Sequence, residues 1–174
     1  MTAPHRHKLT LDEFLAHALA IEEEAVLRYR ELSLQMEVHN NEAVSKVFSD
    51  LAAAEEEHAE RVRQLARGHK LPALKPWEYR WQEPESPESA PYEQAHYLMM
   101  AHHALAMALA AERRAQSYFA DAAVKAADPK LKALAKEFAD EETLHAEHIA
   151  ALLERTPKPP SDWTVDYDPP VSLA

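Results

Sequence analysis

The chain has 174 residues, of which 47% are hydrophobic, so it can form one or at most two domains with a sizeable core. Its single glycine argues against a turn-rich β fold, and the lack of cysteine excludes disulfides, zinc ribbons and thiol catalysis. The net charge of −11 disfavours non-specific binding to nucleic acid or to an anionic membrane.

We expect neither a signal peptide nor a membrane-spanning segment. The opening MTAPHRHKLT has no apolar stretch of the signal-peptide type. No apolar run approaches the length of a membrane span. We therefore expect a cytoplasmic protein that makes no contact with a membrane.

The stretches between the prolines are rich in Ala, Leu, Glu, Lys and Arg, which favour helix.

The first half of the chain predicts two helices. The capping-box pattern TLDE at residues 10–13 starts a helix that should run to about residue 38. A second helix is expected over residues 41–67, and Gly68 follows it at the position that a helix C-terminus favours.

The second half predicts two more helices. The third should begin near Pro91 and run to about Ala127. Asp128 as N-cap and Pro129 in the first turn predict a fourth helix that ends at about Arg155. Four long helices indicate a bundle.

The connections predict the topology. Short links make each consecutive pair of helices antiparallel, but residues 69–90 form a long connection between the pairs. About 20 extended residues reach ~65 Å, which exceeds the ~40 Å length of such a helix. This segment can therefore cross the whole bundle, which gives an all-α, ferritin-like, up-down-down-up arrangement. Trp77, Tyr79 and Trp81 suggest that at least its first half packs, whereas EPESPES at 83–89 has the composition of a mobile acidic linker.

We divide the chain into a bundle over residues 1–156 and a proline-rich tail over residues 157–174. The tail cannot be helical, because its prolines keep it extended. Trp163, Val165 and Tyr167 could pack on the bundle or on a second subunit.

Apolar residues at three- and four-residue spacing define one buried stripe on each helix, and a few charged residues fall within these stripes. Glu55 and His58 continue the stripe of the second helix, while Glu56, Glu57 and Glu60 fall outside it. The residues of the four stripes are Leu11, Phe14, Leu15, Ala18, Ala25, Tyr29, Leu32, Met36, Val44, Val47, Phe48, Leu51, Val62, Leu65, Leu98, Leu105, Ala108, Leu109, Ala115, Phe119, Leu131, Leu134, Phe138, Ile149 and Leu152.

The other helices repeat the pattern of inward-facing acids. Glu22 interrupts the first stripe, Glu112 the third, and Glu142 with His145 the fourth. All lie near the middle of their helices, so in this topology they meet at one level. A buried carboxylate without a partner costs several kcal/mol, or it takes up a proton.

A pair of metal ions would resolve this cost. Four carboxylates balance two divalent cations, two neutral imidazoles complete the ligands, and Glu-x-x-His puts both side chains on one helix face. Carboxylate bundles with two iron or manganese ions use this set: one Glu from each of two helices and Glu-x-x-His from each of the others. Any one of these residues alone would more simply be a partly exposed ion-pair partner, and only the six together favour metal.

The chain also repeats itself. EEEAVLRY from Glu22 matches ERRAQSYF from Glu112, and the stretch from Leu51 matches the stretch from Phe138 with its histidine aligned. A duplicated helix pair would build a two-metal site with pseudo-twofold symmetry.

On these residues the chain resembles the ferritin-like superfamily, and most closely the rubrerythrin-like di-iron proteins, over residues 10–155. The resemblance implies that two Fe ions, with Mn or Zn as alternatives, are bound. It implies that Glu55 and Glu142 bridge the metals and that Tyr29 lies just outside the ligands. The implied metal ligands are Glu22, Glu55, His58, Glu112, Glu142 and His145.

Two departures from the family qualify this interpretation. Rubrerythrin itself carries a cysteine-ligated rubredoxin domain, and this chain has no cysteine. The family also has a second glutamate one turn after the third-helix ligand, and Ala115 stands there. An external electron donor is therefore expected.

The resemblance implies a di-iron oxidoreductase, a ferroxidase or peroxidase-like enzyme that uses O₂ or H₂O₂ in iron or oxidative-stress handling. A di-iron hydroxylase is an alternative, as is a non-enzymatic bundle with structural zinc or a docking role. We expect a homodimer or higher oligomer. Docking of the tail into a protein shell is a further possibility, because PVSLA weakly resembles the C-terminal peptides of encapsulin cargo.

The remaining histidines are not expected to bind the metals. His148 is expected at the surface or an interface, and His102 and His103 lie too far along their helix from Glu112 to join the same site. Solvent exposure is expected for His5, His7, His17, His39, His69 and His96.

Overall fold

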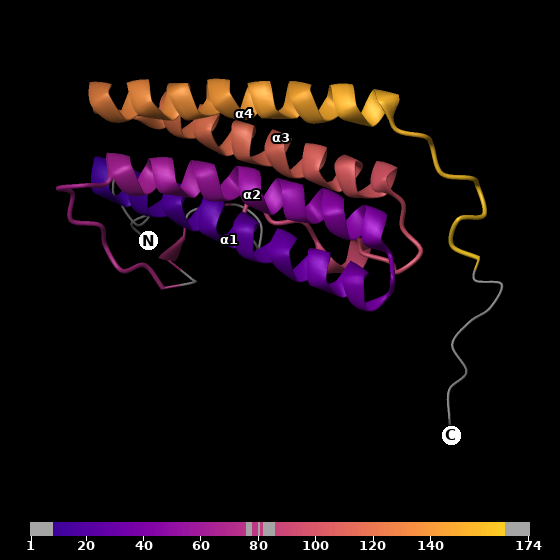
Figure 1. Cartoon of the computed structure of the whole chain (residues 1–174). Coiled ribbons are helices and arrows are strands. Elements are labelled where there is room, and N and C mark those ends of the chain that lie inside the picture. Colours follow the sequence, from indigo (N-terminus) through magenta and orange to yellow (C-terminus); the bar gives the residue numbers. More distant parts are fainter. Residues whose placement is uncertain (1–8, 76–77, 80, 82–85, 166–174) are drawn as a thin grey trace, which may run out of the picture.

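The computed structural model describes residues 9–75, 78–79, 81 and 86–165 of the chain. Within these residues it is all-helical and contains no strand, as the sequence predicted. Figure 1 shows four long helices lying side by side: α1 (Leu11–Val38), α2 (Glu42–Leu65), α3 (Ala101–Lys125) and α4 (Pro129–Arg155).

The helix starts follow from local hydrogen bonds. Thr10 and Glu13 form the predicted capping box: Glu13 N–H donates to Thr10 Oγ1 at 3.2 Å, and Thr10 N–H donates to Glu13 Oε2 at 2.8 Å. Asp128 accepts from Lys130 N–H at 2.9 Å ahead of α4. Gly68 has a φ of +85° just after α2, a conformation that glycine adopts without strain.

The chain path gives the up-down-down-up topology. In Figure 1, α2 returns beside α1, the connection then crosses the length of the bundle, and α3 runs in the same direction as α2 before α4 turns back. This confirms the predicted ferritin-like class of fold. In the described residues no helix is both long enough and apolar enough to cross a membrane.

The third helix begins later than predicted, at Ala101 instead of near Pro91. Asn41, the N-cap of α2, donates from Nδ2 to the carbonyls of Tyr97 at 3.2 Å and of Met99 at 2.7 Å. These long-range bonds hold the backbone outside a helix, and a short 3₁₀ turn, Tyr92–Gln94, forms where the start of the third helix was predicted.

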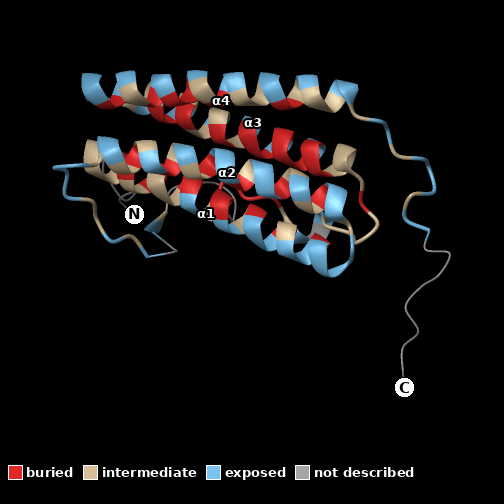
Figure 2. Ribbon diagram, viewed as in Figure 1, coloured by how far each residue is buried: buried red, intermediate tan, exposed pale blue. Residues whose placement is uncertain are grey.

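The core consists of two apolar clusters, one toward each end of the bundle. One cluster contains Phe14, Phe119 and Phe138, whose rings contact one another at centroid distances of 5.3–6.0 Å. The other contains Tyr29 and Phe48, with the two rings stacked at 6.1 Å. Figure 2 shows the buried faces of the helices turned toward one another. The other residues of the predicted stripes belong to these clusters, whereas Leu65 is exposed and Leu98 is half-buried and lies in neither cluster.

The first half of the crossover packs on α1. Tyr79 stacks on Trp81 at 4.3 Å, and both rings meet His17 edge-on. The expectation that His17 is solvated was therefore wrong, because these aromatic rings bury it and its Nδ1 lies 2.6 Å from the Glu13 carbonyl. Trp77 lies outside the described residues.

The second half of the crossover differs most from expectation. EPESPES has the composition of a mobile linker, yet Ser86, Glu88 and Ser89 are buried, and Ala90 belongs to the apolar cluster of Tyr29. The segment turns back on itself here, because Ser89 N–H donates to the Ser86 carbonyl at 3.0 Å. Residues 83–85 lie outside the described part.

The start of the tail returns to the bundle. Trp163 packs on the apolar cluster of Tyr29, and its ring lies 3.9 Å from that of His103. Val165 is exposed, and Tyr167 lies outside the described residues. The division into a bundle and a tail stays a prediction.

Candidate metal centre

Four glutamates form a charged layer between the two apolar clusters. Glu22 comes from α1, Glu55 from α2, Glu112 from α3 and Glu142 from α4, and each is at most 3% exposed. They are buried because they occupy apolar-stripe positions near the middle of each helix, where the four helices face one another. The core is thus interrupted by four acids at one level.

The first hairpin contributes a complete group of three potential ligands. His58 Nδ1 lies 3.0 Å from Glu55 Oε2 and 3.7 Å from Glu22 Oε2. All three donor atoms lie within 4.8 Å of one another, which is compatible with a shared cation.

The second hairpin repeats this geometry. His145 Nδ1 lies 3.2 Å from Glu142 Oε2 and 3.7 Å from Glu112 Oε2. In both groups the histidine presents the same nitrogen to its own-helix glutamate and to the glutamate of the neighbouring helix. The duplicated sequence pattern is therefore a duplicated arrangement of donor atoms.

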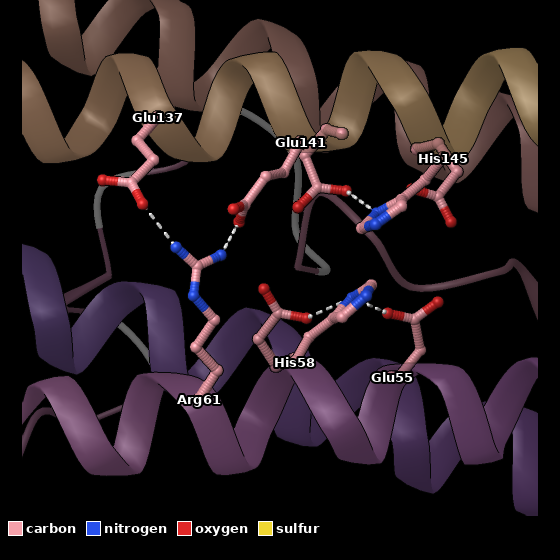
Figure 3. A network of polar contacts seen from close by, with 9 residues as sticks. Glu55, His58, Arg61, Glu137, Glu141 and His145 are labelled. Atoms are coloured by element: carbon pink, nitrogen blue, oxygen red, sulfur yellow. Dashed lines mark hydrogen bonds and ion pairs between the residues drawn. The ribbon is translucent and has the colours of Figure 1, made fainter.

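The two groups meet at their histidines. The imidazole rings of His58 and His145 stack at a centroid distance of 4.1 Å with an interplanar angle of 8°. Their side chains are 25% and 31% exposed, whereas the glutamates are buried. The histidines thus form the solvent-facing side of the layer, between α2 and α4 (Figure 3).

An arginine ties the two hairpins together beside this opening. Figure 3 shows Arg61 reaching from α2 to Glu137 and Glu141 of α4. Its Nη2 lies 2.6 Å from Glu137 Oε1, and its Nη1 contacts Glu141. All three side chains are accessible to solvent, so these two ion pairs contribute little to the free energy of unfolding.

Burial changes the acidity of the layer. Removal from water raises the pKa of Glu55 to about 7 and that of Glu142 to about 8, and it also raises the pKa of Glu22. Burial alone would lower the pKa of the histidines. Hydrogen bonds to the glutamates outweigh it, and they raise the pKa of His58 to about 11 and that of His145 to about 9. Without a metal, protons must therefore occupy part of the layer.

A fifth carboxylate, absent from our prediction, joins the layer from the crossover. Glu88 is fully buried, and one of its oxygens groups within 4.8 Å with oxygens of Glu55 and Glu112. Burial, followed by the charges of the four helical glutamates, raises the pKa of Glu88 well above its ordinary value. No periodic pattern surrounds Glu88 in the sequence, so no signal distinguished it from the other acids of EPESPES. Ala115, where the family resemblance places an extra glutamate, is buried and offers no ligand.

Tyr29 belongs to the same apolar cluster as Ala90, which lies two residues after Glu88 in the chain. Its hydroxyl is fully buried, and burial together with the charges of Glu55, Glu112 and Glu88 raises its pKa well above the ordinary value. Two predicted ligands, Glu55 and Glu112, thus act on the Tyr29 hydroxyl through their charges, and its role just outside the ligands stays a prediction. The equivalent position of the second hairpin is Phe119, which carries no hydroxyl.

Several buried oxygens of the layer have no hydrogen-bond partner among the described residues. Native interiors rarely leave buried polar atoms unpaired, and an unexplained set points to an absent ion or water. Carboxylate oxygens and imidazole nitrogens suit Fe, Mn or Zn. The six predicted residues therefore fit a dinuclear metal site. The unpaired atoms are Oε2 of Glu22, Oε2 of Glu112, both carboxylate oxygens of Glu88 and the hydroxyl of Tyr29.

The family model described as Rubrerythrin matches residues 13–153, which contain all six predicted ligands. The chain belongs to the rubrerythrin family. A crystal structure of an uncharacterized conserved protein from Magnetospirillum magnetotacticum MS-1 is 42% identical, with a TM-score of 0.67. The match covers 87% of this chain and 98% of that one. No curated protein matches.

Membership of the rubrerythrin family and the paired Glu/His groups together indicate a di-metal site. The other histidines that the structure describes are not part of its Glu/His groups. His148 is exposed, His103 packs on Trp163, and His69 Nδ1 lies 2.6 Å from Asp12 Oδ1.

Proposed function

We propose that this rubrerythrin-family protein is a di-iron oxidoreductase that oxidises Fe(II) with O₂ or H₂O₂, or reduces peroxide. The observation that carries this proposal is the duplicated Glu/Glu/His group, with matching donor distances in both halves and with the two histidines at the solvent-facing side. A structural zinc site is usually a single closed set of four ligands, whereas here two three-residue groups adjoin each other.

The donor set suits iron in both common oxidation states. Two bound Fe(II) ions would supply two electrons for the reduction of O₂ or H₂O₂. The carboxylates offset the charge of the cations, and the apolar clusters on both sides exclude bulk water from the layer. A molecule as small as O₂ or H₂O₂ could approach along the partly exposed face of His58 and His145.

The protons that the apoprotein holds would have to leave when metal binds. His58 and His145 bind metal only in their neutral form, and the glutamates only as carboxylates. The 174 residues contain no cysteine to ligate a second iron centre. We therefore propose that electrons come from a separate donor. We also propose that the protein acts as a homodimer or larger oligomer and that it works in the cytoplasm.

Metal counting combined with oxidant exposure tests the proposal. The apoprotein is titrated anaerobically with Fe(II), bound iron per chain is counted, and O₂ or H₂O₂ is then admitted in separate samples. We expect two irons per chain and rapid growth of ferric absorption in the near ultraviolet. The Glu55→Ala/His58→Ala variant serves as the control without a site.

Two results would contradict the di-iron proposal. One is binding of no stoichiometric iron, and the other is zinc that iron does not displace. Either would indicate a structural or docking role for the bundle. Comparison of the initial rates with O₂ and H₂O₂ separates the ferroxidase from the peroxidase form of the proposal.

A further inference from the structure

The buried part of the crossover, residues 86–90, is held in place by two arginines. Arg114 of α3 donates from Nε to the Pro87 carbonyl at 2.8 Å and from Nη2 to the Ser89 carbonyl at 3.0 Å. Arg28 of α1 donates from Nη1 to the Ala90 carbonyl. The backbone is thus fixed at three carbonyls, one before and two after residue 88, from both hairpins.

Arg28 also anchors the residues that follow. Its guanidinium lies 3.7 Å from the centroid of the Tyr92 ring, a cation–π contact. These bonds of the two arginines go to backbone carbonyls, and the Glu88 carboxylate between them accepts no hydrogen bond. The backbone of the segment is tightly specified, and its one acid points toward the charged layer.

The Glu88 carboxylate has no partner within the part of the chain that the structure describes. Both of its oxygens are buried and accept no hydrogen bond. Its close neighbours, Glu55 and Glu112, belong to different halves of the centre, so Glu88 spans the junction between them. Neither histidine belongs to this group. Glu88 therefore approaches from the interior, opposite to the partly exposed imidazoles.

A buried acid surrounded by other acids destabilises the folded protein unless a cation or proton compensates its charge. Arg114 donates to the carbonyls on both sides of Glu88, yet the carboxylate itself accepts no hydrogen bond. This arrangement keeps the carboxylate oxygens available, which is what a metal ligand requires and what a structural ion pair does not.

We propose that Glu88 is a fifth carboxylate ligand of the metal centre, delivered by the crossover segment and positioned by Arg114. This inference rests on the proposed dinuclear site and adds a ligand to it. Four carboxylates balance two divalent ions, and a fifth adds negative charge that favours the more positive, oxidised pair. The crossover is then part of the centre as well as a connection between hairpins.

The test measures Co(II) binding to the full-length apoprotein by calorimetric titration. Glu88→Gln keeps the size of the side chain and removes the ligand charge, and Glu57→Gln is the matched control at an exposed position of α2. We expect two Co(II) per wild-type chain and at least a ten-fold loss of affinity in Glu88→Gln. Loss of an outer hydrogen-bond partner alone costs ~10–100-fold, and loss of a direct ligand should cost no less.

Thermal melting of the same samples provides a second readout with a distinctive sign. Glu88→Gln should not lower the melting temperature of the apoprotein, because it removes an unpartnered acid, but it should reduce the rise in melting temperature that Co(II) produces. A residue that only packs the crossover would shift both forms equally.

Arg114→Gln tests the positioning role. Removal of a cation beside a cation site should by itself strengthen Co(II) binding. Weaker binding in this variant would show that Arg114 acts through Glu88, whereas equal or stronger binding overturns its positioning role.

The outcomes separate the inference from the proposed function. Wild-type affinity in folded Glu88→Gln overturns the ligand role and leaves the dinuclear site intact. Failure of the wild-type chain to bind a pair of Co(II) ions overturns both. Should circular dichroism show that Glu88→Gln does not fold, Glu88→Asp, which keeps the charge and shortens the reach, replaces it. Weakened binding then supports the ligand role, and unchanged binding overturns it.

Discussion

The two hairpins supply the same donor atoms in the same geometry, but they surround them differently. The own-helix distance between His Nδ1 and Glu is 3.0 Å in the first hairpin and 3.2 Å in the second, and both cross-helix distances are 3.7 Å. Seven residues after the first glutamate, however, the first hairpin has Tyr29 and the second has Phe119.

Tyr29 and Phe119 lie in different surroundings. Phe119 packs in the aromatic cluster with Phe14 and Phe138, a wholly apolar environment. Tyr29 belongs to the apolar cluster that includes Ala90 of the crossover, and the charge of Glu88 acts on its hydroxyl. Duplication of the helix pair thus accounts for the two matching Glu/Glu/His groups. The asymmetry between the two halves comes from Tyr29 and from Glu88 of the crossover, which lies outside the repeat.

The largest expected effect comes from removing one half of the centre. Glu55→Ala/His58→Ala should abolish binding of both metals, and Glu142→Ala/His145→Ala should do the same, because each pair removes two ligands of one metal and an expected bridge to the other. Metal per chain is measured after gel filtration, and circular dichroism checks that the helices persist. Retained stoichiometry in either variant would sink the site assignment, and Glu57→Ala is the control.

Single substitutions at the remaining helical glutamates should have smaller and mutually similar effects. Glu22→Gln and Glu112→Gln each remove one ligand, and each should weaken Co(II) binding by at least the ~10–100-fold of an outer-sphere loss. Calorimetric titration compares them directly. A difference of more than tenfold between the two variants would show that the halves are not functionally equivalent.

The charged layer should make the apoprotein less stable as the pH rises. Folding raises the pKa of Glu55 from 4.5 to about 7 and that of Glu142 from 4.5 to about 8. The protonated carboxyls therefore stabilise the folded state fully below pH 4.5, and this contribution is lost as the pH rises to about 7 and 8. His145 and His58, with pKa values raised to about 9 and about 11, extend the loss to higher pH. Metal affinity should rise with pH, because binding displaces these protons.

Melting of the apoprotein in chelator between pH 5.5 and 9 checks this slope. Glu55→Gln/Glu142→Gln should flatten it below pH 8, because neither substituted side chain titrates. An apoprotein whose melting temperature climbs over this window would contradict the proposed protonation of the layer.

The smallest effect is expected from substitutions that give both hairpins the same residue at the position of Tyr29 and Phe119. Tyr29→Phe removes a hydroxyl without a partner, so the free energy of unfolding should change by less than ~1 kcal/mol, with metal stoichiometry unchanged. The converse variant, Phe119→Tyr, buries a new hydroxyl in an apolar cluster and should cost ~1–3 kcal/mol. Chemical denaturation of the apoproteins measures both, and a loss above 2 kcal/mol in Tyr29→Phe would reveal a partner for its hydroxyl.

The helices and their inward-facing acids were predictable from the sequence because the signals are local. Capping at Thr10 and Asp128, the position of Gly68, and three- and four-residue spacing depend on neighbours within one or two turns. The topology followed from the length of the connection. These features were enough to predict the bundle and to choose the six Glu and His residues that the structure brings together in two groups.

The crossover was not predictable, because its structure depends on contacts across long stretches of sequence. Arg28 meets the carbonyl of Ala90 from 62 residues away, and Asn41 reaches Met99 from 58. Such contacts leave no periodic pattern. They delay the start of α3, and the aromatic residues of the same crossover bury His17. The sequence alone thus determined four helices and a paired donor set, and only the tertiary structure decided that an acid from a linker-like segment, Glu88, joins them.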